Sequence, residues 1–221
     1  MMSVWVLVPV KPLNRAKSRL SAVLAPEQRA ALAEKTLRRT LSVVGSLPQA
    51  MGTLVISRDS HALAIAREMG SHTVQESGTP ELNKALMRAT RVLASWRADS
   101  VLILPADIPL VNAEDLTKIV RLGQAKNSVV IASDHQQDGT NVLFVRPPGM
   151  FSYAYGDNSF DTHRRLARLA QANLHIYESE RLKLDLDTPE DLELYREYVT
   201  QGKFGAEPLS DETQAETGDQ R

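Results

Sequence analysis

The sequence has no cysteine, no excess of either charge and no long apolar run. Among its 221 residues the absence of cysteine excludes disulfides, thiolate metal sites, iron–sulfur clusters and cysteine nucleophiles. The 26 lysines and arginines are balanced by 27 acidic residues, so the basic excess of a nucleic-acid-binding protein is missing. No apolar run approaches the roughly 18–20 residues of a membrane span. We therefore expect a cytoplasmic globular protein with neither a nucleic-acid nor a membrane partner.

Two common nucleotide-binding motifs are also missing. The chain contains neither the GxGxxG fingerprint of dinucleotide-binding folds nor the GxxxxGK[ST] loop of many nucleotide triphosphatases. The N-terminal stretch MMSVWVLVPVKP has no basic segment ahead of its apolar residues. It is therefore expected to form a strand and not a secretory signal.

Short apolar runs alternate with longer amphipathic runs, which predicts an α/β fold with a largely parallel sheet. Strands are predicted at residues 4–10, 53–57, 72–75, 100–107, 128–133, 141–145, 175–179 and 182–187. Helices are predicted at residues 26–47, 60–69, 81–96, 113–124, 159–172 and 188–199. The later strands break the alternation, which indicates an antiparallel portion in a mixed sheet. We expect one domain over residues 1–201 and a disordered acidic tail over 202–221, where periodicity is lost.

A basic loop follows the first predicted strand. Lys11 ends that strand, and Arg15, Lys17 and Arg19 follow it in the segment VPVKPLNRAKSRL. Ligands of such sheets bind beyond the carboxyl ends of the strands. These cations are therefore candidates for binding a polyphosphate. The alternative is a solvated basic face without a ligand.

Acidic residues follow two other strands. Asp107 comes directly after an apolar run and lies between two prolines. Asp185 and Asp187 are two residues apart on a predicted strand, so their carboxylates would share one face and repel unless a cation joins them. Carboxylate oxygens are suitable ligands for Mg²⁺. The alternative at each position is a turn or a helix start, where aspartate is common.

Glycine and hydroxyl residues suggest a second anion site. Gly139 and Thr140 precede a predicted strand, and Gly156 and Ser159 precede a predicted helix. Backbone amides and hydroxyls in such loops bind small phosphates and carboxylates, although they are also common where nothing binds. His163 in that helix fits a core or a surface position equally well. Together with the basic loop and the acidic strand ends, this pattern indicates nucleotidyl transfer, in which charge neutralisation and positioning do most of the work.

The chain resembles the guanylyltransferase family of coenzyme F-420 biosynthesis, which comprises 2-phospho-L-lactate guanylyltransferase and a bacterial counterpart that uses phosphoenolpyruvate. The resemblance lies in VPVKPLNRAKSRL, ELNKAL, LPADIPL, DGTNVLF, YGDNSFDTH and LDLDTPEDL, and it spans residues 4–198. It implies a GT-A-like fold, similar to nucleotide-diphospho-sugar transferases, with a mixed, mostly parallel sheet flanked by helices. The implied reaction transfers GMP from GTP to a small phosphorylated acid and releases pyrophosphate. Because the first loop lacks the glycine pair usual in such folds, phosphate binding would depend more on its Lys and Arg side chains.

The resemblance also implies roles for individual residues. Asp107 and Asp187 would hold Mg²⁺ and would act with Lys17 in catalysis. Nucleotide binding would involve Lys11, Lys17, Arg19, Leu82, Asn83 and Leu86, and acceptor binding would involve Thr140, Gly156 and Ser159. Leu82 and Leu86 also fit the stripe of a core helix.

The identity of the acceptor stays open at this level. Phosphoenolpyruvate, 2-phospho-L-lactate and 3-phosphoglycerate each carry a phosphate and a carboxylate at similar spacing. The same fold would also serve a molybdopterin or sugar-phosphate acceptor, or a non-catalytic nucleotide-binding domain. A homodimer is expected only from the general frequency of two-fold oligomers.

Overall fold

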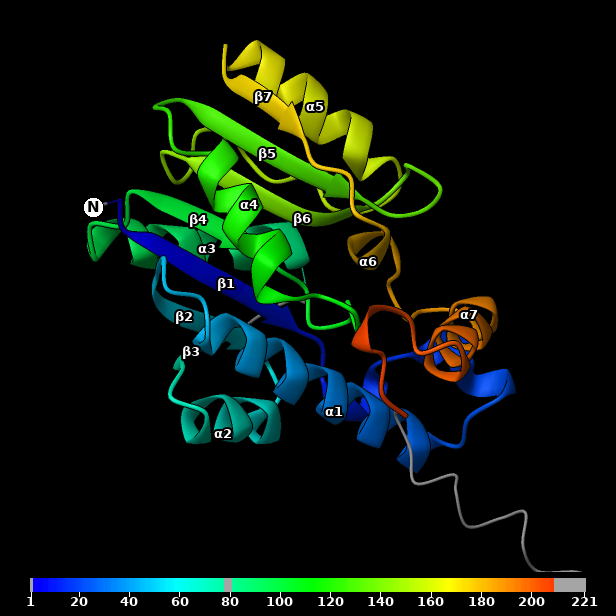
Figure 1. The fold of residues 1–221 in the computed structure, drawn as a ribbon. Coiled ribbons are helices and arrows are strands. Elements are labelled where there is room, and N and C mark those ends of the chain that lie inside the picture. The colour runs from blue at the N-terminus through cyan, green and yellow to red at the C-terminus, as the bar shows by residue number, and fades with distance from the viewer. Residues whose placement is uncertain (1, 78–80, 209–221) are drawn as a thin grey trace, which may run out of the picture.

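The computed structural model describes residues 2–77 and 81–208. Within these residues, seven strands form one twisted sheet (Figure 1). The strands are β1 (Val4–Val10), β2 (Ala50–Ser57), β3 (His72–Gln75), β4 (Ser100–Ile103), β5 (Ser128–Ser133), β6 (Thr140–Arg146) and β7 (Asn173–Ile176). Their order in the sheet is β3-β2-β1-β4-β6-β5-β7.

The sheet is mixed and mostly parallel, as the sequence predicts. Strand β1 pairs in parallel with β2 and β4, β2 with β3, and β5 with β7. Strand β6 runs antiparallel to both of its neighbours, β4 and β5. The expected antiparallel portion is therefore confirmed, and it lies where the alternation of strands and helices is interrupted along the chain.

The helices between the strands cover both faces of the sheet. They are α1 (Pro26–Gly45), α2 (Ser60–Glu68), α3 (Leu82–Ser95), α4 (Ala113–Leu122), α5 (Ser159–Leu169), α6 (Glu180–Lys183) and α7 (Pro189–Thr200), with 3-10 turns η1 (Leu13–Arg15), η2 (Ser18–Ala22) and η3 (Lys203–Gly205). In the described part of the chain, every helix is too short or too polar to cross a membrane.

Two apolar clusters hold the three layers together. Helices α1, α2 and α4 pack on one face of the sheet, and α3 and α5 pack on the other (Figure 1). In β1, Val6 and Val8 belong to the first cluster and Leu7 to the second, because successive side chains of a strand point to opposite faces. Burial on both faces explains why the central strands are continuous apolar runs in the sequence.

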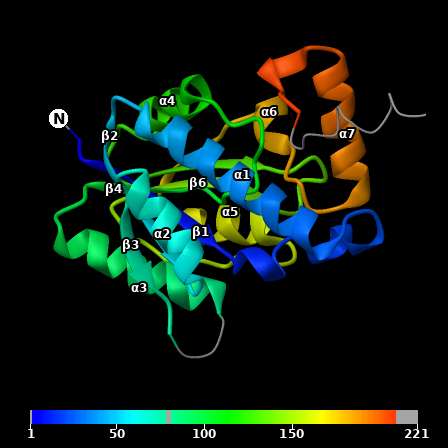
Figure 2. The same ribbon diagram turned by 90° about the horizontal axis from the view of Figure 1, so that it is seen from below.

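A third, smaller cluster joins α7 to the beginning of α1, beyond the carboxyl ends of the strands (Figure 2). It contains Leu20 and Leu32 from the first part of the chain and Leu184, Leu186 and Tyr195 from the last part. This packing carries the last acidic segment back across the sheet.

Several boundaries differ from those expected. Strand β4 ends at Ile103 and not at residue 107, because the amide of Leu104 makes the last bond to β1 and Pro105 has no amide hydrogen to continue the ladder. Strand β2 begins earlier, at Ala50, and β7 covers Asn173–Ile176 instead of 175–179.

The prediction of a strand at residues 182–187 is wrong. Helix α6 ends at Lys183, and the residues that follow it pair with no strand. The alternating leucines that suggest a strand instead anchor this irregular segment in the interior: Leu182, Leu184 and Leu186 are all buried. Asp185 lies between two of these leucines and Asp187 directly follows the last of them, and both aspartates line the cavity described below.

The folded part of the chain extends past residue 202, where the tail was predicted to begin. Within residues 202–208, η3 follows α7, the Phe204 ring packs edge-on against Tyr198, and the Tyr195 hydroxyl donates to the carbonyl of Glu207 at 2.8 Å. Residues 202–208 therefore belong to the folded domain. The rest of the predicted tail, 209–221, lies outside the described residues.

Candidate active site

A cavity of about 530 Å³ opens at the carboxyl ends of β1 and β4. After β1 the chain continues to one side of the sheet, to β2 and β3, whereas β4 lies on the other side of β1. This is the switch point of an open sheet, where the loops diverge and leave a crevice for a ligand. The volume is within the range of small-molecule sites.

Lys17 enters this cavity from the loop between the two 3-10 turns. Its side chain is 5% exposed, and its Nζ lies 3.9 Å from Asp107 Oδ2 without a hydrogen-bond partner in the described residues. The residue has a left-handed backbone (φ 56°), a conformation that costs a side-chain-bearing residue about 1 kcal/mol or more. A buried ammonium group normally requires anionic partners at hydrogen-bond distance. This one therefore indicates a binding site for an anion.

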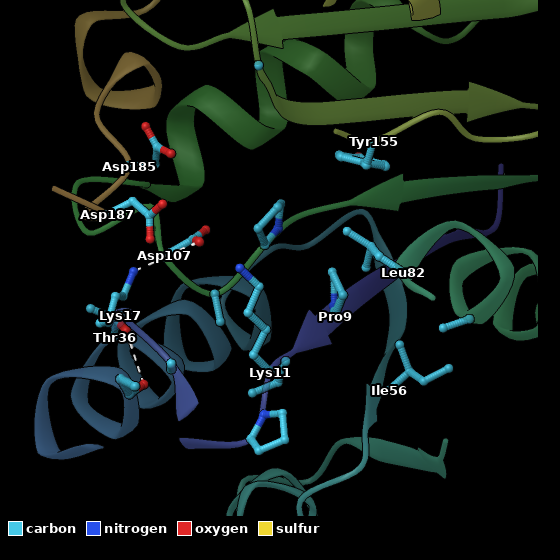
Figure 3. Close-up of a pocket in the computed structure, with 18 of the residues that line it drawn as sticks. Pro9, Lys11, Lys17, Thr36, Ile56, Leu82, Asp107, Tyr155, Asp185 and Asp187 are labelled. Carbon is cyan, nitrogen blue, oxygen red and sulfur yellow. Dashed lines mark hydrogen bonds and ion pairs between the residues drawn. The ribbon is translucent and has the colours of Figure 1, made fainter. Parts of the chain in front are cut away.

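The other cations of the basic loop divide between the cavity and the surface. Lys11 lines the cavity and lies between its acidic and its apolar sides in Figure 3. Arg19 does not line the cavity: its side chain is 71% exposed, and its Nη1 lies 3.2 Å from Oδ2 of Asp187, which does line it. Arg15 is exposed on η1 and does not line the cavity.

Three aspartates line the acidic side of the cavity: Asp107, Asp185 and Asp187 (Figure 3). The carbonyl of Asp107 accepts a hydrogen bond from the amide of Leu186 at 3.0 Å, which joins the two acidic segments directly. Residues far apart in the sequence are thus brought together as expected. Burial, and then repulsion by the carboxylates of Asp107 and Asp191, raises the pKa of Asp185 to about 7.

The alternative of a helix-capping role for these aspartates does not hold. The N-cap of α7 is Thr188, whose side chain accepts from the amide of Asp191, and Asp191 in turn accepts from the amides of Asp187 and Thr188. The N-cap of α4 is Asn112. Neither Asp107 nor Asp187 caps a helix, and both line the cavity. Lys17 lies beside the carboxylate of Asp107, and Arg19 lies beside that of Asp187.

The donor chemistry of this acidic side fits Mg²⁺, which prefers carboxylate oxygens combined with phosphate oxygens and water. Mutual repulsion among these partly buried carboxylates would be relieved by a cation. In residues 2–77 and 81–208, however, no three acidic or histidine side chains are already arranged to hold a metal ion by themselves. An ion here would need oxygen atoms from a bound ligand to complete its coordination.

The lining of the cavity also includes residues that offer hydrogen-bond donors. Thr140 at the start of β6, Gly156 and Ser159 at the start of α5 all line it. The hydroxyl of Thr140 is 2.9 Å from Nδ1 of His163, which lies fully buried behind it. The loop before α5 is fixed by Asn83, whose side-chain amide donates to the carbonyl of Tyr155 at 2.9 Å and accepts from its amide at 2.7 Å.

The structure therefore separates the three residues of α3 for which the resemblance implies nucleotide contacts. Leu82 lines the cavity and is partly exposed to it. Leu86 is fully buried in the core between α3 and the sheet and does not line the cavity. Asn83 does not line the cavity either, because both of its amide atoms bind the backbone of Tyr155. For Leu86 the alternative of a core residue is correct.

Several residues that line the cavity were not identified from the sequence, and two of them have buried polar atoms without a hydrogen-bond partner in the described residues. Glu76 follows β3, is 12% exposed, and its Oε1 has no hydrogen-bond partner in the described residues; Arg88 lies 3.6 Å from it. The hydroxyl of Tyr155 is also buried, and no group in residues 2–77 or 81–208 forms a hydrogen bond with it. Neither residue belongs to a charged cluster in the sequence. The one available signal for Glu76 is its position directly after a strand.

Comparison with known proteins gives a consistent result. A family model described as "Guanylyl transferase CofC like" matches residues 4–202. The chain is 38% identical over 193 residues to the phosphoenolpyruvate guanylyltransferase of Rubrobacter xylanophilus (86% of this chain, 92% of the relative). It is 34% identical over 217 residues to the 2-phospho-L-lactate guanylyltransferase of Methanothermobacter thermautotrophicus (94% of each chain). A crystal structure from Desulfovibrio desulfuricans G20, assigned to the nucleotide-diphospho-sugar transferases, superposes with a TM-score of 0.71 at 19% identity and covers 90% of this chain and 88% of its own, which shows the shared fold.

Proposed function

Since this chain belongs to the CofC-like guanylyl transferase family, we propose that it transfers GMP from GTP to a small phosphorylated carboxylic acid and releases pyrophosphate. The observation that carries the proposal is the cavity itself, where the buried ammonium of Lys17 lies beside Asp107 and hydrogen-bond donors belong to the same lining. Such an arrangement suits two anionic substrates that must approach each other.

The triphosphate would lie along the basic loop. Lys11 and Lys17 would contact phosphate oxygens inside the cavity, and the exposed Arg19 would reach them from its position beside Asp187. The nucleoside would occupy the apolar side, formed by Ile56, Leu82 and neighbouring residues (Figure 3). There Glu76 would accept hydrogen bonds from the N1–H and amino group of guanine, a pair of donors that adenine does not present.

Asp107 and Asp187, with Asp185 beside them, would hold Mg²⁺ together with triphosphate oxygens. A bound Mg²⁺ supplies charge neutralisation of the phosphates and fixes their geometry. Before the nucleotide arrives, Lys17 and Arg19 partly neutralise these carboxylates, at 3.9 Å and 3.2 Å. Both cations would turn to the phosphates when these bind.

The acceptor acid would bind between Thr140, Gly156 and Ser159. Its phosphate oxygen attacks the α-phosphorus of GTP, a new P–O bond forms, and the bond from the α-phosphorus to the bridging oxygen breaks as pyrophosphate leaves. The attacking oxygen is already ionised at neutral pH, so the reaction needs no general base. This agrees with a cavity in which His163 is held behind Thr140 and does not line the surface.

Phosphoenolpyruvate and 2-phospho-L-lactate are the proposed acceptors, because relatives named for each cover most of this chain. The proposal can be tested by mass spectrometry of the reaction products. The purified protein would be incubated with GTP, Mg²⁺ and a mixture of phosphoenolpyruvate, 2-phospho-L-lactate and 3-phosphoglycerate. We expect one guanosine diphospho-acid and stoichiometric pyrophosphate. ATP in place of GTP, and the Asp187→Asn variant, serve as controls. GTP binding without any pyrophosphate release would contradict the proposal and favour a non-catalytic domain.

A further inference from the structure

His163 contacts both segments that carry the proposed acceptor-binding residues: the start of β6, with Thr140, and the loop before α5, with Gly156. It is fully buried on α5, one turn after Ser159. Its Nδ1 is 2.9 Å from the hydroxyl of Thr140 on β6, and its Nε2 is 3.0 Å from the amide nitrogen of Ala154 in the loop before α5. One side chain thus spans both segments.

These two contacts determine where the ring carries its proton. A backbone amide can only donate, so Nε2 must be the acceptor of the Ala154 hydrogen bond and must be unprotonated. Burial lowers the pKa of His163 to about 4, so the ring is neutral at physiological pH. A neutral ring with a bare Nε2 carries its hydrogen on Nδ1.

The state of the ring then decides the direction of the next hydrogen bond. Nδ1–H donates to the oxygen of Thr140, so the Thr140 hydroxyl is not the donor in that contact. Its own hydrogen remains available, and Thr140 lines the cavity. A hydroxyl oriented in this way donates its hydrogen toward the cavity. Because hydrogen bonds to charged acceptors are the stronger ones, this arrangement favours an anionic ligand over a neutral one.

We propose that His163 is a positioning residue that fixes Thr140 as a hydrogen-bond donor toward the acceptor acid and holds the adjoining loop so that Gly156 faces the same anion. The inference rests on the proposed function and deepens it. The amides of Ala154 and Tyr155 are already occupied, by His163 and by Asn83. The next amide along the chain belongs to Gly156, which lines the cavity.

Two conservative substitutions each remove one of the two hydrogen bonds of His163, to Thr140 or to Ala154, and keep the other. In His163→Asn the side-chain amide reaches about as far as Nδ1 and can still donate to Thr140, whereas the bond to Ala154 is lost. In His163→Gln the side-chain oxygen reaches about as far as Nε2 and can still accept from Ala154, whereas the donor to Thr140 is lost. Tyr153→Phe is the matched control, because it removes a buried hydrogen bond in the same loop, to Thr90 at 3.0 Å, without touching Thr140.

Steady-state kinetics would measure the KM for GTP and for the acceptor acid separately. We expect His163→Gln to raise the KM for the acid by about tenfold to a hundredfold, the effect of weakening one hydrogen bond to an anion, with the KM for GTP within about twofold of the unchanged protein. His163→Asn should recover part of this loss, and Tyr153→Phe should leave both constants unchanged. Because His163 acts through Thr140, adding His163→Gln to Thr140→Val should cause no further increase.

Two results would overturn the inference. The first is a His163→Gln enzyme whose KM for the acid equals that of the unchanged protein, or whose effect multiplies with that of Thr140→Val. The second comes from ¹⁵N NMR of the imidazole rings at pH 7.5, with the His163 signals assigned by their loss in His163→Gln: a protonated Nε2 would contradict the required tautomer. If no acid accepts GMP at all, the proposed function fails instead, and the tautomer measurement still tests the hydrogen-bond arrangement.

Discussion

Replacing Lys17 by methionine is expected to slow guanylyl transfer strongly and, at the same time, to leave the folded protein as stable as before or more so. The two effects have opposite signs because the ammonium group is in an unfavourable position until an anion binds. Methionine has a similar length and shape, and like lysine it bears a Cβ in the left-handed backbone conformation at this position. The substitution therefore removes the charge and little else.

The structure sets the expected magnitudes. With its side chain 5% exposed and its nearest carboxylate oxygen 3.9 Å away, the Lys17 ammonium is desolvated without a hydrogen bond to compensate. Replacing such a group by an apolar one should change the free energy of unfolding by between zero and about +1 kcal/mol, or up to roughly 2–4 °C in Tm for a chain of this size. Loss of a charged contact to a developing phosphate charge typically lowers kcat by about 100- to 1,000-fold.

Pyrophosphate release would report turnover, and thermal unfolding in the absence of nucleotide would report stability. Lys118→Met is the matched control, since Lys118 forms an exposed pair with Glu114 on α4 and does not line the cavity. This variant should change neither quantity appreciably. The reasoning would be refuted by a Lys17→Met protein that keeps its turnover, or by one that is destabilised by several degrees, because Lys17 would then be a structural residue.

Three further predictions follow from the same cavity. Asp107→Asn and Asp187→Asn should each reduce turnover about a thousandfold or more with unchanged circular dichroism; pyrophosphate release near the original rate would remove the metal assignment. Glu76→Gln should lower the preference for GTP over ATP by about tenfold or more, measured as the ratio of kcat/KM values, because the amide presents its own donors to the base; an unchanged ratio would show that the base is recognised elsewhere. Since the pKa of His163 falls from 6.5 to about 4 on folding, the unfolded chain binds the proton more tightly, and stability is complete above pH 6.5 and decreases as the pH falls from 6.5 toward 4, by up to about 3 kcal/mol. His163→Gln should flatten this part of the stability curve, and an equally steep curve in the variant would assign the decrease to other groups.

Local patterns in the sequence were sufficient for the layers of the fold. Runs such as VWVLVPV predict strands covered on both faces, and the observed alternation of Val6, Leu7 and Val8 between two clusters agrees with that. The position of Asp107 after an apolar run predicts that it lies at the carboxyl edge of the sheet. These features depend on near neighbours in the chain, which is why the sequence alone reveals them.

The same alternation was misleading at residues 182–187. A period of two predicts a strand, but a strand also needs a partner, and this segment pairs with none of the seven strands. Its leucines pack into two different apolar clusters instead. Leu182 belongs to the main core, and Leu184 and Leu186 pack in the smaller cluster with α7. Whether alternating residues become a strand is decided by what they pack against.

By itself, the sequence determined which chemical groups follow the strands: cations after β1, carboxylates after β4 and before α7, and glycines and hydroxyls around β6 and α5. Tertiary structure decided which of them meet. Lys17 lies beside Asp107, Asn83 binds the backbone of Tyr155, and His163 joins Thr140 to Ala154. Local propensity arises within a few residues, whereas hydrogen bonds and ion pairs between distant segments exist only after the sheet and its helices have packed.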